Sequence, residues 1–502
     1  MLDGLFHLFS AFETFANFNS LFNVLWATFV GIVIGALPGL TATMGVALLT
    51  TLTYKMGPDQ AILSLICCYV GAIYGGSRSA ILLNIPGTPA NAATTLDGFP
   101  LAKQGKAGEA MGLATSSSMI GTFIGVLFLA IIAPALAEIA LDFQSYEYFW
   151  LAIFGVVIAG QMCSFDDALK GWIAGFLGLF IAMIGQEGIH AEERFTFGWS
   201  ELGGGIALIP ALVGTFGVAE VLTVMRNRAA ELATNVVDRV MPRWSDLWRY
   251  RRTVIRSGLI GTTVGIIPGV GEDIGAWISY AAARRASKEK ELFTKGSREG
   301  LCAAETGNNA AIPGAIIPAL TLAVPGSAPA AVLLAAMLIH GLRPGPMIMI
   351  ESPDFVFQVV WMVVLATLAM GILGLALVRP LLYILRVPRE RLMPVVFVLC
   401  MIGPYAITER VFDIYVTLFF GVLGFILREM KYPMAPLVLG LILGDILDKN
   451  LRRALVLSDG DFSPFFIRPI SAVLWVTTAL VIIAAIPAVQ RATAKLMGWD
   501  KA

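Results

Sequence analysis

Two short stretches, each with Pro-Gly followed by a hydroxyl residue, are the clearest candidates for chemistry in this 502-residue sequence. The first reads NIPGTPANA over 84–92, and the second reads AVPGSAPAA over 323–331. Pro-Gly stops one helix, and the hydroxyl of Thr88 or Ser327 can cap the next helix, whose first turn tolerates proline. A new helix start presents backbone N–H groups and partial positive charge, which suits the oxygens of a carboxylate. A proline kink that only aids packing is the alternative interpretation. The residues of these stretches that we assign to substrate binding are Pro86, Gly87, Thr88, Asn91, Gly326 and Ser327.

Three more polar residues join this candidate site. Arg78 lies in GGSRSAILLN, a few residues before the first Pro-Gly break. Its guanidinium can hold a carboxylate bidentately, or it can snorkel to the membrane interface. Asn308 and Asn309 precede an apolar run, where adjacent amides can bind substrate or satisfy the backbone of a broken helix. Both alternatives stay open for each of these residues.

A second matched pair consists of the glycine-rich turns GALPGLTATMG (35–45) and GIIPGVGEDIG (265–275). Carbonyl groups freed by such turns can take a sodium ion in transporters. Glu272 and Asp273 follow the second turn, and an acidic residue at membrane depth is a functional candidate, although at the interface it is an ordinary solvated charge. We predict a site for a coupling cation at Gly39, Thr41, Gly269 and Asp273. We expect no organic cofactor, and no metal beyond a possible sodium ion, because the three histidines and five cysteines show no ligand spacing.

These motifs belong to an internal repeat. One block of glycines and a proline recurs 230 residues later, a second block recurs at an offset of 239, and a third at 246. The first members are Gly31, Gly35, Pro38, Gly39 and Gly45; Gly75, Pro86 and Gly87; and Gly125, Pro134, Asp167, Gly175 and Gly178. Chance in a chain with 51 glycines can produce one such block, but hardly three in the same order. We therefore predict two homologous halves.

The predicted organisation is that of an all-α polytopic membrane protein with about 12 transmembrane segments. Only 14% of the residues are charged, against about 25% in soluble domains. The predicted segments are an interfacial N-terminus (1–20), a first membrane repeat (21–225), a basic connector (226–256), a second membrane repeat (257–450) and a C-terminal segment with one transmembrane helix (451–502).

Charge predicts the orientation of the halves. The connector 226–256 is rich in arginine and is expected in the cytoplasm, whereas the acidic loop 186–201 is expected on the other side. The two halves are then inverted. Because a second basic loop follows residue 283, the segment 257–283 is either a hairpin with its turn at Pro268 or a single tilted span.

Duplicated halves with Pro/Gly-broken helices are typical of secondary transporters, in which irregular backbone is tolerated only where it lines a protein cavity. A channel is the nearest alternative, since broken helices also build ion filters. A membrane enzyme is less consistent with the sequence, which contains no HExxH motif, nucleophile elbow or Walker motif. The net charge of +0 gives no indication of nucleic-acid binding.

The long motifs resemble the large TctA-type membrane subunit of tripartite tricarboxylate transporters. The resemblance covers nearly the whole chain, with matching stretches at 74–110, 195–206, 261–277, 305–334 and 435–455, and its most specific parts are the PGTPA block (86–90) and the block from NNA to PGS (308–327). Arg78 stands where a small or hydroxyl residue is expected in the family, and Gly204 where Asp is more usual. The resemblance implies an importer in the bacterial inner membrane that uses a sodium or proton gradient. It also implies a tricarboxylate or dicarboxylate substrate, a small TctB-type membrane subunit, a periplasmic TctC-type solute-binding protein and a possible homo-oligomer.

Overall fold

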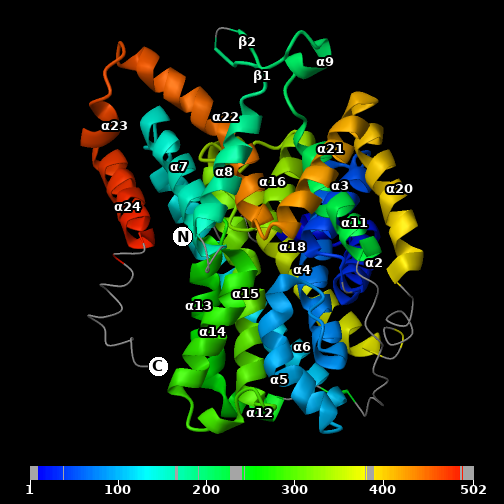
Figure 1. Ribbon diagram of the computed structural model, residues 1–502. Coiled ribbons are helices and arrows are strands. Elements are labelled where there is room, and N and C mark those ends of the chain that lie inside the picture. Colours follow the sequence, from blue (N-terminus) through cyan, green and yellow to red (C-terminus); the bar gives the residue numbers. More distant parts are fainter. Residues whose placement is uncertain are drawn as a thin grey trace. The chain divides into compact units, whose positions relative to one another are not determined.

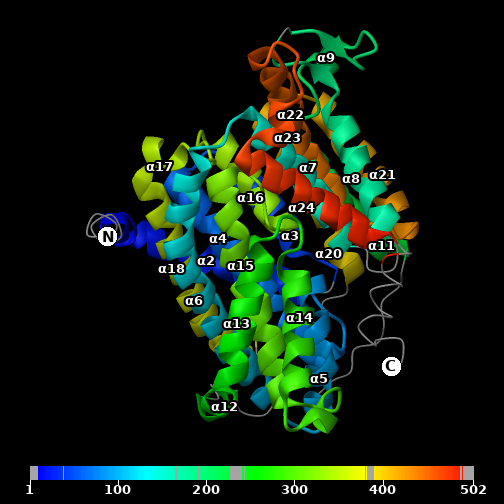
Figure 2. The same ribbon diagram turned by 90° about the vertical axis from the view of Figure 1, so that its left-hand side faces the viewer.

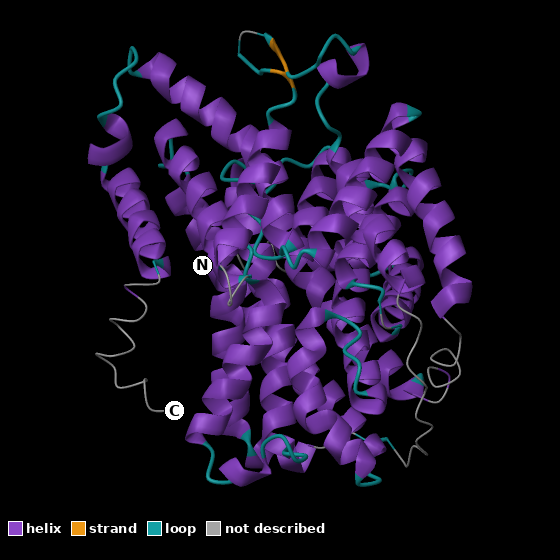
Figure 3. Cartoon of the chain, in the orientation of Figure 1, coloured by secondary structure: helices purple, strands orange, loops and turns teal. Residues whose placement is uncertain are grey.

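A computed structural model describes residues 10–37, 39–163, 168–189, 191–226, 240–241, 244–378, 380, 389–486 and 489. Helices make up almost all regular structure in this part of the chain (Figure 3). Six described helices are long and apolar enough to cross a membrane, and four shorter helices are also apolar. The predicted all-α polytopic class is therefore confirmed, whereas the number of about 12 segments stays a prediction.

The chain forms two compact units, and each unit combines segments from both predicted halves. The first unit contains residues 1–140 and 209–425, and the second contains 141–208 and 426–502. The predicted repeats 21–225 and 257–450 therefore do not coincide with the compact units, and the duplication itself stays a prediction. Pro38, Asp167 and much of the basic connector lie outside the described residues.

The first unit holds both Pro-Gly motifs. Its elements before the connector are α2 (Phe18–Ala36), α3 (Ala42–Thr53), α4 (Pro58–Leu83), the 3-10 turn η1 (Pro89–Asn91), α5 (Ala92–Lys103), α6 (Ala107–Ala140), α10 (Leu208–Leu212), the π-helix η2 (Val213–Val218) and α11 (Ala219–Arg226). Those after the connector are α12 (Trp244–Arg249), α13 (Arg251–Ile266), α14 (Gly271–Ala286), η3 (Lys290–Leu292), α15 (Arg298–Leu322), α16 (Ala328–Ile339), α17 (Ile348–Glu351), α18 (Pro353–Ala376), α20 (Arg389–Thr408) and α21 (Phe412–Glu429), whose last residues belong to the second unit.

Glycines allow α2 to pack directly on α4. A Cβ atom on Gly35 would lie 1.9 Å from the carbonyl oxygen of Ala72, so only hydrogen fits there. The corresponding contact recurs between α13 and α15, where a Cβ atom on Gly265 would lie 2.4 Å from the carbonyl oxygen of Ala311. The two glycines are 230 residues apart and their partners 239 residues apart, which are the offsets of the predicted sequence repeat.

The segment around Pro268 forms a hairpin and not a single tilted span. Helices α13 and α14 lie side by side in both views (Figures 1 and 2). Their outer ends are tied together, because Arg249 pairs with Glu289 at 2.6 Å and Thr253 and Ser287 both donate to Glu299. Gly269 turns the chain with φ +74°, a conformation that favours glycine.

Helices α4 and α15, which correspond in the predicted repeat, run in opposite directions. Ser77 near the end of α4 donates to Glu305 near the start of α15. Asp97 of α5, which follows α4, accepts a hydrogen bond from the backbone N–H of Ser297 at the start of α15.

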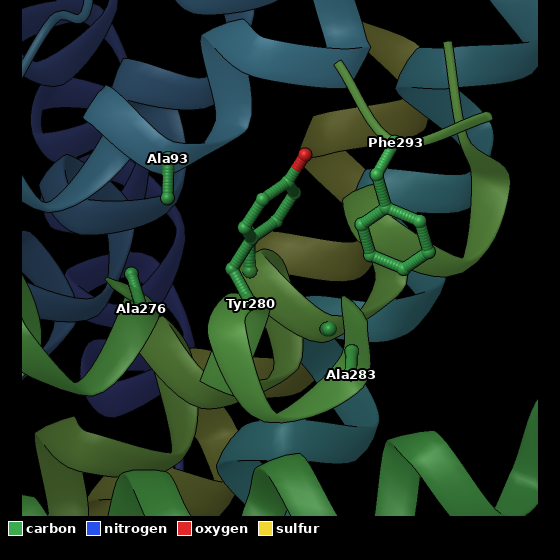
Figure 4. Packing of buried hydrophobic residues seen from close by; sticks show 7 residues of the cluster. Ala93, Ala276, Tyr280, Ala283 and Phe293 are labelled. Carbon is green, nitrogen blue, oxygen red and sulfur yellow. The ribbon is translucent and has the colours of Figure 1, made fainter. Parts of the chain in front are cut away.

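Helix α5 packs against the hairpin through an apolar cluster. Figure 4 shows Ala93 of α5 facing Ala276 and Tyr280 of α14 in this cluster.

The second unit contains α7 (Ser145–Met162), α8 (Ala168–Ala182), β1 (Gly185–Gln186), β2 (Glu193–Arg194), α9 (Ser200–Gly203), α22 (Met434–Leu457), α23 (Pro464–Ile467) and α24 (Pro469–Ala485). Strands β1 and β2 form a two-residue antiparallel pair within the acidic loop. Arg194 beside this pair holds Asp448 of α22 at 2.8 Å, and Arg452 pairs with Glu187. Basic residues thus offset part of the predicted negative charge of the loop.

Candidate functional site

Both Pro-Gly motifs break their helices at corresponding residues. Helix α4 ends at Leu83 and α15 ends at Leu322, and the next residues, Asn84 and Ala323, both adopt a left-handed conformation with φ 56°. This conformation is costly for a residue with a side chain and persists only where the surroundings hold it. The two breaks are therefore built in the same way.

The second motif starts a helix as predicted. The Ser327 hydroxyl accepts the N–H of Ala330 at 3.4 Å and caps α16. The hydroxyl also lies 2.7 Å from that of Tyr69 on α4 and 3.3 Å from the Glu272 carboxylate. Tyr69 itself donates to Glu272 through a very short hydrogen bond. Ser327 is thus buried in a polar cluster with residues of both predicted halves.

The predicted cap by Thr88 is wrong. Thr88 precedes the 3-10 turn η1, and its hydroxyl makes no capping bond there. Instead it donates to the side-chain oxygen of Asn91 at 2.6 Å, and the Asn91 amide donates to Ser77 at 3.0 Å. A helix cap requires a side-chain oxygen that accepts a hydrogen bond from a free backbone N–H group. The Thr88 hydroxyl is instead part of a network of side-chain hydrogen bonds.

The Pro-Gly glycines are packed against backbone. A Cβ atom on Gly87 would lie 1.9 Å from the carbonyl oxygen of Gly35, and one on Gly326 would lie 2.1 Å from that of Gly265. Backbone therefore fills the space beside both glycines, while Pro86 next to Gly87 is half-buried. These contacts favour a packing role for the two glycines and leave hydroxyl and amide groups as the nearby candidates for binding.

Arg78 is buried without a carboxylate partner among the described residues. One guanidinium nitrogen donates to Thr115 at 2.9 Å and to the carbonyl oxygen of Gly374 at 2.8 Å. The group lies 4.7 Å from the ring centre of Tyr74, within cation–π range. Its Nε and Nη1 atoms have no hydrogen-bond partner in the described part of the chain. Since the side chain is only 1% exposed, the snorkelling alternative does not describe this structure.

The two asparagines of α15 differ in their partners. Asn309 donates to Ser118 at 2.9 Å and to the carbonyl oxygen of Glu305 at 3.0 Å. Asn308 is fully buried, and neither its side-chain nitrogen nor its oxygen has a partner among the described residues. A buried polar group left unsatisfied costs about 1–3 kcal/mol, so the Asn308 amide is a candidate for ligand binding.

Glu305 is a buried acid that sequence reasoning passed over. Its carboxylate accepts from Ser77 at 2.8 Å, from Thr94 at 2.5 Å and from Ser118 at 2.8 Å. The residue is fully buried, one turn before Asn308 and Asn309. The signal was present in the sequence, because an acid inside a long apolar helix is a functional candidate.

The predicted cation-coupling residues are not gathered around one centre by their contacts. Thr41 uses its hydroxyl to cap α3, where it accepts from Met44 at 3.2 Å. The N–H of Gly269 donates to Pro325 of the second motif at 3.3 Å, while Gly39 turns the chain with φ +95°. Asp273 is exposed, whereas its neighbour Glu272 is buried beside Ser327. A coupling role for these residues stays a prediction.

The comparisons with known proteins agree with this architecture. Residues 21–439 match the family described as "Tripartite tricarboxylate transporter TctA family". A protein of Agrobacterium vitis named "Uncharacterized 52.8 kDa protein in TAR-I ttuC' 3'region" is 36% identical over 499 residues, which cover 98% of each chain. A second protein of that organism, "Uncharacterized protein in TAR-II ttuC' 3'region", is 32% identical over 231 residues, which cover 46% of this chain and 96% of its relative.

Proposed function

The chain belongs to the tripartite tricarboxylate transporter TctA family, and from this premise we propose that it is the large membrane subunit of an importer for a small organic carboxylate. The family is a transporter component and not an enzyme. We place the protein in the bacterial inner membrane, together with a TctB-type membrane subunit and a TctC-type periplasmic binding protein. We assign the substrate to the tricarboxylate or dicarboxylate class, and its uptake to a sodium or proton gradient.

The observation that carries the proposed binding site is the pair of buried, unpaired donor groups on Arg78 and Asn308. A carboxylate cannot enter an apolar interior without compensation, because an isolated buried charge costs many kcal/mol. Arg78 offers two free guanidinium nitrogens on the helix that leads to the first motif, and Asn308 lies on the helix that leads to the second. We propose that substrate carboxylates bind these groups, with the hydroxyls of Thr88 and Ser327 nearby.

We further propose that transport proceeds by alternating access between two inverted repeats. Three things support this: the matched breaks at Asn84 and Ala323, the matched glycine contacts, and the opposite directions of α4 and α15. In such transporters the substrate site lies where the broken helices of the two repeats meet.

Uptake and stability measured together test this site. We expect Arg78→Gln and Asn308→Ala each to reduce uptake of labelled citrate or malate into proteoliposomes by about ten- to hundredfold, the effect of losing a hydrogen bond worth about 1.5–3 kcal/mol. Asn308→Ala is not expected to lower the melting temperature, because it removes an amide that the protein leaves unpaired. The matched control is Asn23→Ala, since Asn23 is also buried in this unit but bonds to Gln60.

Three outcomes would contradict the proposal. Wild-type uptake by both Arg78→Gln and Asn308→Ala would place the substrate site elsewhere. Failure of the wild-type complex to take up either citrate or malate would contradict the substrate class. Net current without exchange of labelled substrate in counterflow would favour a channel over a carrier.

A further inference from the structure

We propose that Glu305 carries a proton together with the anionic substrate, and that Arg78 couples the charge of Glu305 to substrate binding. This inference rests on the proposed transport function and names the residue that takes up the coupling cation. Its basis is a buried carboxylate with hydroxyl partners, a hydrogen-bond chain that leads to it, and a buried cation close to it.

The hydroxyl shell of Glu305 suits both protonation states of the acid. Ser77, Thr94 and Ser118 each donate to the carboxylate in the structure. A hydroxyl can also accept a hydrogen bond, so one of these hydroxyls can rotate and accept a hydrogen bond from the O–H of the neutral carboxyl group. A shell of backbone N–H groups or ammonium groups would have no such freedom.

A chain of side-chain hydrogen bonds joins the first motif to this acid. Thr88 donates to Asn91, Asn91 donates to Ser77, and Ser77 donates to Glu305. All three bonds are directed toward the carboxylate. A change in the protonation of Glu305 therefore has a path by which it reorients groups as far as Thr88, at the proposed substrate site.

Arg78 is a buried cation that lies close to Glu305, because residues next to it and next to its partner contact the acid. It follows Ser77 directly in α4, and its partner Thr115 lies one turn before Ser118 on α6. The two charges are not within ion-pair distance, so each compensates the other only through the field between them. When a substrate carboxylate pairs with Arg78, that compensation is lost, and a proton from the medium adding to the carboxylate oxygen of Glu305 restores the balance.

The helices packed on α15 carry other titratable groups, and those that hydrogen-bond or pair do so with partners other than Glu305. These groups are Asp59, Cys67, Cys68, Tyr69, Tyr74 and Arg78 on α4, Asp97 and Lys103 on α5, Glu109 and Glu138 on α6, Arg251, Arg252 and Arg256 on α13, Glu272, Asp273, Tyr280, Arg284 and Arg285 on α14, and Arg298, Glu299 and Cys302 on α15 itself; η1 and α16 contribute none. Glu109 pairs with Arg298, and Asp97 accepts from Tyr280 and the start of α15.

The bonding pattern favours a proton over a sodium ion. Ser77 and Ser118 already accept from Asn91 and Asn309, so their own hydroxyl hydrogens point to the carboxylate. A metal ion at this place would need those hydrogens redirected while the hydroxyl oxygens faced the ion. The carboxylate is the acceptor that the described structure provides for both of them.

The test uses the complete transporter with its partner subunits in proteoliposomes, and labelled citrate as the probe. Glu305→Gln keeps the shape of the neutral acid but cannot exchange a proton. We expect uptake driven by an imposed pH gradient to fall at least tenfold in this variant, while citrate counterflow stays within about twofold of wild type. Proton movement that accompanies citrate uptake, followed with a pH-sensitive dye, is expected to disappear. The matched control, Glu299→Gln on the same helix, is expected to keep all three properties.

The inference is overturned if Glu305→Gln still moves protons with citrate. It is also overturned if a sodium gradient drives uptake while a pH gradient does not, an outcome that leaves the proposed transport function intact. Glu305→Asp keeps a titrating group, and we expect it to retain uptake driven by the pH gradient. Loss of both counterflow and coupling in Glu305→Asp would make Glu305 a structural residue. Absence of counterflow with both citrate and malate in the wild type would instead contradict the proposed function.

Discussion

Thr88 and Ser327 occupy matching positions in the predicted repeat but make different hydrogen bonds in the structure. Thr88 is a donor in a chain of side chains, whereas Ser327 is both a helix cap and a partner of Tyr69. Similar residues in a repeat therefore need not share a role. The difference arises because η1 separates Thr88 from the start of α5, while α16 begins directly after Ser327.

This difference leads to different physical costs of alanine substitution. We expect Thr88→Ala and Ser327→Ala each to reduce citrate uptake by about ten- to hundredfold, the effect of losing a hydrogen bond to a charged group. Ser327→Ala is also expected to lower stability by about 0.5–2 kcal/mol, the usual cost of losing a helix cap. Thr88→Ala is expected to lower stability by about 1–3 kcal/mol, because it leaves the buried side-chain oxygen of Asn91 without its donor. Uptake assays and thermal unfolding of the purified protein measure the two effects. Thr88→Ser and Ser327→Thr are expected to be milder, because each keeps its hydroxyl. Wild-type uptake by both alanine variants would show that the motifs are packing kinks.

The hydrogen-bond partners of the buried polar residues are the part of the site that could not be predicted from the sequence. Arg78 and Asn308 are candidates by residue type, but which of their polar atoms lack a partner among the described residues depends on the neighbours that face them in three dimensions. Glu305 could be found from the sequence as an acid inside an apolar helix, but its three hydroxyl partners could not, because they come from α4, α5 and α6, far from it in the chain. No local pattern brings Ser77, Thr94 and Ser118 together.

At the scale of elements, the Pro-Gly breaks depend on direct backbone contact. We expect Gly87→Ala and Gly326→Ala to reduce the yield of folded, monodisperse protein. The added methyl group would overlap with a backbone carbonyl oxygen, which lies 1.9 Å from the Cβ position at Gly87 and 2.1 Å from that at Gly326. Overpacking of this kind typically costs about 1–3 kcal/mol. Size-exclusion chromatography and thermal unfolding are the measurements. Gly57→Ala is the matched control, because nothing lies within 4 Å of a Cβ atom there. Normal folding of both motif variants would mean that the backbone moves apart easily at the breaks.

The helix breaks themselves were predictable, while the contacts that hold them were not. Proline and glycine act on their own backbone, so Pro-Gly indicates a break from sequence alone. The same local information could not decide between a hairpin and a tilted span for 257–283, because the tie between Arg249 and Glu289 joins residues 40 positions apart. Nor could it show that compact units would combine pieces of both predicted halves.

At the scale of the whole molecule, helix direction carries the proposal of inverted repeats. Corresponding loops should then lie on opposite sides of the membrane. The loop between α3 and α4 corresponds to the loop between α14 and α15, and each contains an exposed lysine, Lys55 or Lys288. The second loop is basic and is expected in the cytoplasm, so the first is expected outside.

Labelling of single cysteines tests both statements in intact cells. In a Cys163→Ala background, whose other four cysteines are buried, we expect Lys55→Cys to react with a membrane-impermeant maleimide at once. Lys288→Cys is expected to react only after the cells are permeabilised, because its loop faces the cytoplasm. Labelling of both positions from the outside would reject the inversion. Labelling of Lys288→Cys alone from the outside would keep the inversion but reverse the orientation, since corresponding loops would still lie on opposite faces.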